Sequence, residues 1–281
     1  MSKIPLNTCS LSAKKIKTIR NKLWNKHKTK KIRSKSKREI NKYISHLFEK
    51  EKYKDKKPVI PLTICQVWHD KSDIPKSVEE SIHLIQEQNP EFKHYLFEEK
   101  DWEKFIKENY SKRILDAYHS VVPYAIKADL FRYCYLYKNG GIYLDSKYYC
   151  INGFKLILLT DKEYFCKDIE TSLHGIYNAF IVCKPKNKIL FKAINECVKN
   201  IKNKYYGNSG LCPTGPLLLK KFFTRKQINN LELTHEYINN TNRFILLNGY
   251  RILKHHEDYR KEKEQQNNHW SIYWKNKTMY K

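Results

Sequence analysis

The chain of 281 residues is 41% hydrophobic and 14% aromatic, which is enough apolar material to bury one sizeable core. No stretch reaches the roughly 18 consecutive apolar residues that a membrane-spanning helix needs. The first residues also lack the apolar stretch of a signal peptide. The composition therefore argues against an integral membrane protein, and we expect a soluble, cytoplasmic protein with no transmembrane segment.

Residues 1–57 hold most of the formal net charge of +26. They contain seventeen Lys and three Arg against three Glu and one Asp, so this stretch alone carries +16. Its few apolar residues recur at helical spacing, which predicts a basic extension that is helical or partly disordered. Such a segment suits a polyanion or an anionic membrane surface, but lysine is abundant throughout the chain and indicates no specific partner. We place a globular domain over 58–281.

Beyond Pro58 the first predicted elements alternate between strand and helix. Residues 62–68 form an apolar, β-branched run that is typical of a buried strand, and 92–97 form a second strand. Helical periodicity covers 76–88 and then 101–118, the latter as one helix or two. The order βαβα favours a twisted, mostly parallel sheet flanked by helices.

The next helix and strand bring a carboxylate to one edge of this sheet. Apolar residues recur from Ile126 to Tyr137 on one helical face, and Gly140 and Gly141 end the helix. A short strand over 142–144 follows, and Asp145 stands directly after it. Because ligands bind at the carboxyl ends of strands in open α/β sheets, Asp145 is a candidate site residue.

The rest of the chain gives weaker signals. We expect strands near 163–166, 177–183 and 244–247, and helices near 188–201 and 216–223. The polar run His255–Asp258 has the residue types of a metal site, but four successive polar residues in lysine-rich sequence are more often solvated, and we interpret them so. The last thirty residues show no clear periodic element.

Asp129 and Arg132 lie three residues apart on the predicted helix and therefore project from one side of it. A carboxylate and a guanidinium held above a strand end can hydrogen-bond to sugar hydroxyls and phosphate oxygens. Most Asp-x-x-Arg pairs are surface ion pairs, so this pair alone indicates no function.

The continuation of that pair is more specific. The run from Asp129-Leu-Phe-Arg132 to Tyr137-Lys-Asn-Gly-Gly-Ile-Tyr-Leu-Asp145 resembles glycosyltransferase family 32, whose sugar-binding region contains a D-x-D motif, and more distantly the glucosylating clostridial toxins. The resemblance extends over residues 60–275. Weaker matches lie before and after this run, in the same order as in the family. They are Ile64-Cys-Gln66-Val-Trp68, Asn178 before an inner strand, Thr214-Gly-Pro216, and His269 with Trp274.

The resemblance implies a GT-A type nucleotide-diphospho-sugar transferase fold. It implies transfer of a hexosyl group from a nucleotide-diphosphate sugar to an acceptor hydroxyl, with retention of anomeric configuration. It assigns Asp129 and Arg132 to the donor sugar, and Asp145 with His269 to a divalent cation, Mn or Mg. The donor-binding residues that it implies are Gln66, Trp68, Tyr143, Lys147, Asn178 and Trp274. The acceptor, a glycan or a protein, does not follow from these residues.

The D-x-D motif is incomplete, because Asp145-Ser-Lys147 has a lysine at the second acidic position. Three interpretations stay open: Asp145 and His269 hold a cation more weakly than two acids would, the Lys147 ammonium compensates the diphosphate charge, or the chain is a catalytically degenerate module that binds polyanions through its basic surface. Asp129, Arg132 and Asp145 in one pocket would favour the enzyme. A pocket filled by Lys147 in an ion pair with Asp145 would favour the module.

The resemblance also leads to an expectation about the location and source of the protein. Eukaryotic members of the family commonly work in the Golgi behind a membrane anchor, and this sequence contains no such segment. We therefore expect a bacterial, viral or host-cytosolic protein.

Overall fold

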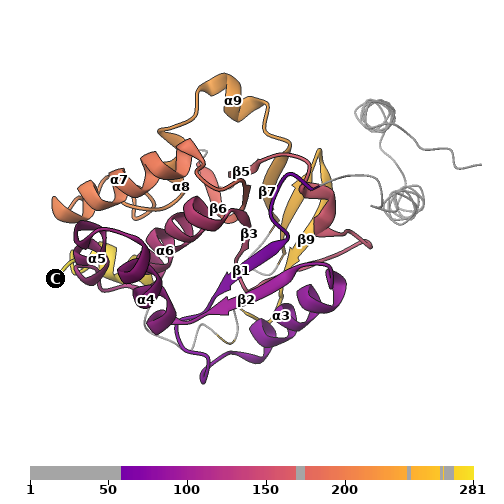
Figure 1. The fold of residues 1–281 in the computed structure, drawn as a ribbon, viewed down its shortest axis with the longest axis horizontal. Coiled ribbons are helices and arrows are strands. Elements are labelled where there is room, and N and C mark those ends of the chain that lie inside the picture. Colours follow the sequence, from indigo (N-terminus) through magenta and orange to yellow (C-terminus); the bar gives the residue numbers. More distant parts are fainter. Residues whose placement is uncertain (1–57, 169–174, 239–241, 260–261, 263–268) are drawn as a thin grey trace, which may run out of the picture. The chain divides into compact units, whose positions relative to one another are not determined.

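The computed structural model describes residues 58–281, except 169–174, 239–241, 260–261 and 263–268. The described residues belong to one compact unit, Lys56–Lys281. The basic extension predicted over 1–57 lies outside the described residues. The strands of the unit are β1 (Thr63–Val67), β2 (Lys93–Phe97), β3 (Gly141–Leu144), β4 (Tyr148–Cys150), β5 (Tyr164–Asp168), β6 (Ile176–Cys183), β7 (Leu233–Tyr237), β8 (Arg243–Leu247) and β9 (Tyr250–His255). They form one sheet in the order β2-β1-β3-β6-β5-β7-β8-β9-β4 (Figure 1).

The first half of the unit builds a parallel part of the sheet. β1 pairs in parallel with β2 and with β3. The helix α3 (Lys76–Gln88) connects β1 to β2, and α4 (Glu99–Asn109), α5 (Lys112–His119) and α6 (Tyr124–Asn139) connect β2 to β3. These helices and strands lie where the periodicity predicts them, and the segment 101–118 is divided into two helices.

The remaining pairs make the sheet mixed. β5 and β7 are parallel, whereas β3 with β6, β5 with β6, β7 with β8, β8 with β9 and β4 with β9 are antiparallel. The α/β class predicted from the sequence is confirmed. The parallel arrangement is concentrated around β1, which is where the βαβα order predicts it.

The helices cover both faces of the sheet. Figure 1 shows α4, α5, α6, α7 (Lys188–Lys202) and α8 (Pro216–Lys220) grouped on one side, with α3 across the sheet from them. α6 packs against α4, α7 and β3, and α3 packs against β4. Two further short helices are α9 (Arg225–Asn229) and α11 (Trp270–Lys275). The apolar run Leu156–Leu159 forms the 3-10 helix η2.

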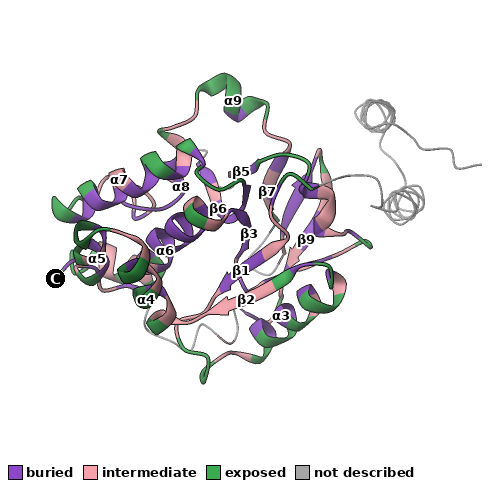
Figure 2. Ribbon diagram, in the orientation of Figure 1, coloured by how far each residue is buried: buried purple, intermediate pink, exposed green. Residues whose placement is uncertain are grey.

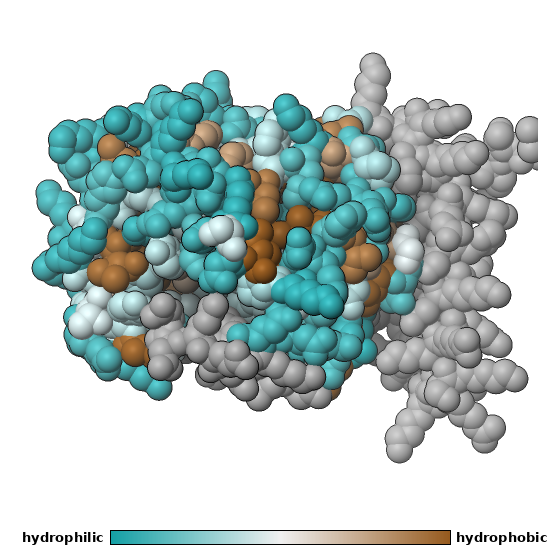
Figure 3. All heavy atoms as spheres, turned by 90° about the horizontal axis from the view of Figure 1, so that it is seen from below, coloured by the Kyte–Doolittle hydropathy of each residue, from teal (hydrophilic) through white to brown (hydrophobic). Residues whose placement is uncertain are grey.

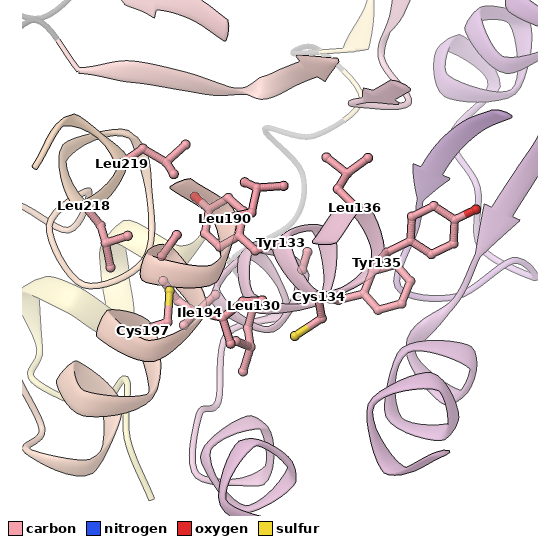
Figure 4. Packing of buried hydrophobic residues seen from close by; sticks show 14 of the residues in the cluster. Leu130, Tyr133, Cys134, Tyr135, Leu136, Leu190, Ile194, Cys197, Leu218 and Leu219 are labelled. Carbon is pink, nitrogen blue, oxygen red and sulfur yellow. The ribbon is translucent and has the colours of Figure 1, made fainter. Parts of the chain in front are cut away.

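The helix α6 is the centre of the main hydrophobic core. It is buried around most of its circumference, as the purple ribbon of Figure 2 shows. Its residues Leu130 and Tyr133 meet Leu190 and Ile194 of α7 in the packing drawn in Figure 4. Burial of a leucine or isoleucine side chain contributes about 1.5–3 kcal/mol. Such packing holds α6 firmly, and with it the charged residues that this helix carries.

The surface of the unit is polar on the face that Figure 3 shows. One face is largely hydrophilic with isolated hydrophobic patches (Figure 3). None of the helices in the described ranges is long and apolar enough to cross a membrane. The seven cysteines among these residues are all free thiols, and six of them are buried.

Candidate functional site

A cavity of about 350 Å³ opens at the carboxyl ends of β1 and β3. β1 contributes Val67 and then Trp68, and β3 contributes Tyr143 and then Asp145. The cavity lining also includes His69, Asp73, Tyr124, Arg132, Ser146, Lys147, Tyr259 and Trp270. The site therefore lies where an open α/β sheet places its ligands.

Asp145 is fixed at the end of β3 by its own backbone and by neighbouring donors. Its backbone N–H donates to the carbonyl of Ala179 at 2.8 Å. The hydroxyl of Tyr143 donates to Oδ1 at 2.9 Å, and Arg132 Nη1 lies 3.4 Å from the same oxygen. The Asp145 side chain remains 19% exposed, so it can still meet a ligand in the cavity.

Arg132 is a rigid cation on α6. Its Nη1 donates to the carbonyl of Asn178 at 2.8 Å, and its guanidinium lies 4.4 Å from the centre of the Tyr143 ring. Nε donates to the carbonyl of Ala128 at 3.3 Å. Because backbone and ring both hold the guanidinium, little conformational entropy is left to lose when an anion binds.

Asp129 lies behind Arg132 and does not line the cavity. Its Oδ1 is 3.2 Å from Arg132 Nη2 and accepts a hydrogen bond from Asn178 Nδ2 at 2.8 Å. Its Oδ2 accepts from the hydroxyl of Thr214 at 2.7 Å. Burial raises the pKa of Asp129, although Arg132 and the two hydrogen bonds oppose that shift. The carboxylate is thus placed to orient Arg132.

Lys147 enters the cavity and pairs with Asp145. Its Nζ lies 3.0 Å from Asp145 Oδ2 and 5.5 Å from the centre of the Tyr259 ring. Burial acts to lower the pKa of Lys147, but attraction to Asp145 outweighs burial and the pKa is raised. Burial likewise opposes ionisation of Asp145, but Lys147 and Arg132 hold its pKa below the ordinary value. Both groups are therefore charged at neutral pH.

Among the described residues, no set of side chains forms a site for a divalent cation by itself. Within the described ranges, no three His, Cys, Asp or Glu side chains are grouped as metal ligands. Both oxygens of Asp145 already face hydrogen-bond donors or cations. His269 does not line the cavity, and its Nδ1 lies 2.6 Å from the hydroxyl of Ser271 at the start of α11.

Three other residues that the sequence suggested for donor binding also lie outside the cavity lining. Gln66 is buried in β1, with its Oε1 2.6 Å from Nε2 of His94. Asn178 supports Asp129 from β6. Trp274 Nε1 donates to the carbonyl of Tyr206 at 2.9 Å. The structure brings Trp68, Tyr143, Arg132, Asp145 and Lys147 together and places these three residues around them.

Several lining residues have no signal in the sequence. Tyr259 reaches the cavity because β9 pairs with β4, and the N–H of His256 donates to the carbonyl of Lys147 at 2.8 Å. His69 stacks on Tyr124 with their ring centres 4.8 Å apart. Such contacts depend on pairings between distant segments, which local periodicity does not reveal.

One segment of the chain matches a known family of sugar-binding regions. Residues 75–164 match the family described as "Glycosyltransferase sugar-binding region containing DXD motif", and this segment includes Asp129, Arg132 and Asp145. The mixed sheet with flanking helices and the cavity at the strand ends fit a GT-A-like α/β fold. The match covers about a third of the chain, which is thus similar to the sugar-binding region of glycosyltransferases.

Individual relatives are mannosyltransferases. The chain is 33% identical over 98 residues to an initiation-specific alpha-1,6-mannosyltransferase of Candida albicans, covering 33% of this chain and 25% of that protein. It is 29% and 32% identical over 172 and 178 residues to inositol phosphoceramide mannosyltransferases 1 and 3 of Schizosaccharomyces pombe, covering 59% and 63% of this chain. The chain spans about half the length of those two relatives, 52% and 48%.

Among solved structures, the chain is similar to PaToxG glycosyltransferase. It is 15% identical, with a TM-score of 0.48 over 73% of this chain and 76% of that one. The glycosyltransferase domain of the YGT toxin is 9% identical, with a TM-score of 0.41 over 53% and 64%.

Proposed function

We propose that the protein transfers a hexosyl group from a nucleotide-diphosphate sugar to an acceptor hydroxyl. The observation that carries this proposal is the convergence of Arg132, Asp145 and Lys147 in one cavity within the matched sugar-binding region. Two cations beside a carboxylate suit a ligand that has both a diphosphate and sugar hydroxyls. The cavity remains open beside the Lys147–Asp145 pair, with a volume of about 350 Å³.

Each residue has a separate role in this proposal. Arg132 and Lys147 bind the diphosphate, and their positive charge stabilises the negative charge that develops as the nucleotide departs. Asp145 accepts hydrogen bonds from sugar hydroxyls, and its charge attracts both cations, one at each oxygen. Asp129 positions Arg132, and Trp68 packs against the nucleotide base. We align Asp145-Ser146-Lys147 with the family's D-x-D motif.

We further propose that the group transferred is mannosyl and that its anomeric configuration is retained. The three relatives above are all described as mannosyltransferases, and retention is implied by the resemblance to family 32. The acceptor hydroxyl belongs to a glycan, a lipid headgroup or a protein, since the relatives differ in their acceptors and acceptor loops vary.

Donor hydrolysis tests this proposal. Purified protein is incubated with GDP-mannose, GDP-fucose, UDP-glucose, UDP-galactose or UDP-N-acetylglucosamine, with Mn²⁺ or with chelator, and nucleotide release is followed. We expect release from one donor, and a loss of at least about 100-fold in Asp145→Asn, which keeps the side-chain shape but removes its charge. Asp116→Asn is the matched control, because Asp116 is an exposed carboxylate paired with Lys112 at 2.8 Å and lies outside the cavity.

A second function has one observation in its favour. The ion pair between Lys147 and Asp145 inside the cavity is the arrangement that a catalytically inactive binding protein would show. The same screen separates the two. An inactive binding protein would bind nucleotide or a polyanion but release no nucleotide from any donor, whereas an enzyme would release it from one.

A further inference from the structure

The positive charge of the cavity comes from side chains of the protein. Arg132 and Lys147 both face Asp145, at 3.4 Å from Oδ1 and 3.0 Å from Oδ2. The two cations therefore flank a single carboxylate from opposite oxygens. Lys147 supplies its positive charge at the end of β3, whereas Arg132 also pairs with Asp129 at 3.2 Å and the carboxylate of Asp73 also lines the cavity.

The charge of the Lys147 side chain equals that of a second acid together with a divalent cation. In a site with two acids, the second acid and a divalent cation together carry one net positive charge. Lys147 alone carries the same charge at the residue that we align with the second acid of the motif. A diphosphate therefore meets the same local charge in both arrangements, without an ion having to bind first.

A divalent cation and Lys147 would also compete for one oxygen. Mg²⁺ binds carboxylate oxygens at about 2.0–2.1 Å, and Lys147 Nζ already lies 3.0 Å from Asp145 Oδ2. The other oxygen accepts the hydroxyl of Tyr143 at 2.9 Å. A dication would have to displace the ammonium or repel it at close range, so the cavity as built is selective against the ion.

The position of Lys147 is fixed by contacts of its ammonium and of its backbone. Its ammonium lies between Asp145 and the ring of Tyr259, 5.5 Å from the ring centre. Its backbone carbonyl is hydrogen-bonded to the N–H of His256 at 2.8 Å. The side chain is only 23% exposed, so its charge is weakly screened by solvent.

We propose that Lys147 takes the place of the divalent cation in this protein and binds the donor's diphosphate directly, so that nucleotide binding needs no metal. This inference rests on the proposed function, because it concerns the same donor site.

Calorimetric titration of the full chain with UDP and with GDP, in EDTA or in Mn²⁺, tests the inference. We expect the dissociation constant of the preferred nucleotide to change by less than about twofold between the two conditions. Lys147→Ala should weaken binding by at least about tenfold in both. Lys147→Asp creates a second acid and should bind nucleotide only with Mn²⁺, and bound Mn²⁺ should then be detectable by electron paramagnetic resonance.

Lys221→Asp is the matched control. Lys221 lies outside the cavity and, like Lys147, has a carboxylate and an aromatic ring as neighbours: Glu196 at 2.9 Å and the ring centre of Tyr205 at 5.6 Å, although its side chain is more exposed, at 44%. It should bind nucleotide as the wild type does, with or without Mn²⁺. Circular dichroism verifies that all the variants are folded.

The outcomes separate this inference from the proposed function. Wild-type binding that disappears in EDTA and returns with Mn²⁺ would overturn the inference and leave the proposed function standing. Absence of binding by any nucleotide in either condition would overturn both. Equal binding in both conditions, lost in Lys147→Ala, would support both.

Discussion

The carboxylate of Asp129 contacts Arg132 and does not line the cavity. Its two oxygens are occupied by Arg132, by Asn178 and by Thr214, at 3.2, 2.8 and 2.7 Å. A buried carboxylate requires such partners, because an unpaired buried charge is costly. We expect Asp129 to fix the orientation of the Arg132 guanidinium together with the carbonyl of Asn178 and the ring of Tyr143.

Thr214→Val tests that support. Valine keeps the shape of threonine but removes the hydroxyl that donates to Asp129 Oδ2 at 2.7 Å. We expect the free energy of unfolding, measured in urea, to fall by about 1–3 kcal/mol, because one buried carboxylate oxygen loses its donor. Donor hydrolysis should fall by about tenfold as Arg132 becomes less well oriented.

Thr160→Val is the control for this variant. Thr160 is also buried, and its hydroxyl donates to the carbonyl of Ile157 at 2.7 Å, outside the cavity. Its loss should lower stability without lowering donor hydrolysis. If Thr214→Val loses stability and keeps full activity, Asp129 has a structural role alone.

The sequence predicted which charged residues lie at the site, but it did not predict how far each one lies from the cavity. Helical spacing placed Asp129 and Arg132 on one side of α6, and the structure places them there. It did not reveal that Asp129 lies behind Arg132 and outside the cavity lining, since depth depends on α7 and on the segment around Thr214. Direct contact of Asp129 with the donor sugar stays a prediction.

The turn between α6 and β3 sets the position of the site. Gly140 and Gly141 have φ values of 65° and 99°, which few residues other than glycine adopt. A Cβ on Gly141 would lie 2.2 Å from Oγ1 of Thr63 and 2.8 Å from its carbonyl oxygen. Glycine therefore allows β3 to pair closely with β1 and deliver Asp145.

Gly141→Ala should disturb this pairing. The added methyl group meets backbone of β1 that cannot move freely, and the positive φ adds strain. We expect a loss of about 3 kcal/mol or more in the free energy of unfolding, together with reduced donor hydrolysis. Urea denaturation and nucleotide release measure the two effects.

Gly153→Ala separates conformational strain from the clash. Gly153 also has a positive φ, 68°, but it is exposed. Its substitution should cost about 1–2 kcal/mol from backbone strain alone and should preserve activity. If the free energy of unfolding falls equally in the two variants, the close approach of β3 to β1 adds nothing to the cost of the Gly141→Ala substitution.

Elements with a strong local pattern were predicted well, and short paired strands were not. The helix over Lys76–Gln88 was predicted with the same bounds as α3. β4, β7 and β9 were not predicted, because they are short or carry polar residues, and β4 in addition pairs with the distant strand β9. The interpretation of His255 as solvated was wrong, since it is buried in β9 next to Tyr148.

At the scale of the whole molecule, the βαβα order was enough to predict an α/β fold with its site at a strand end. It did not predict that the remaining strands join the same sheet mainly in antiparallel pairs. That arrangement brings Tyr259 and β9 to Lys147 and completes the cavity. A polyanion surface on residues 1–57 and a cytoplasmic location stay predictions.

The stability of the whole unit should fall on mild acidification because of two histidines. Burial lowers the pKa of His255 to about 3 and that of His94 to about 4, from an ordinary value of 6.5. Both are therefore neutral in the folded protein at pH 5, while the unfolded chain takes up protons below pH 6.5. Their contribution to stability is complete above pH 6.5 and is lost as the pH falls towards 3 to 4.

Urea denaturation at pH 6.5 and pH 5 measures this loss. Each histidine should lower the free energy of unfolding by about 2 kcal/mol over that interval, since each pH unit is worth about 1.4 kcal/mol per proton. His255→Phe keeps a ring beside Tyr148 and Tyr259 and cannot be protonated. It should lose about 2 kcal/mol less than the wild type between the two pH values. An unchanged loss would show that the proton uptake occurs elsewhere in the molecule.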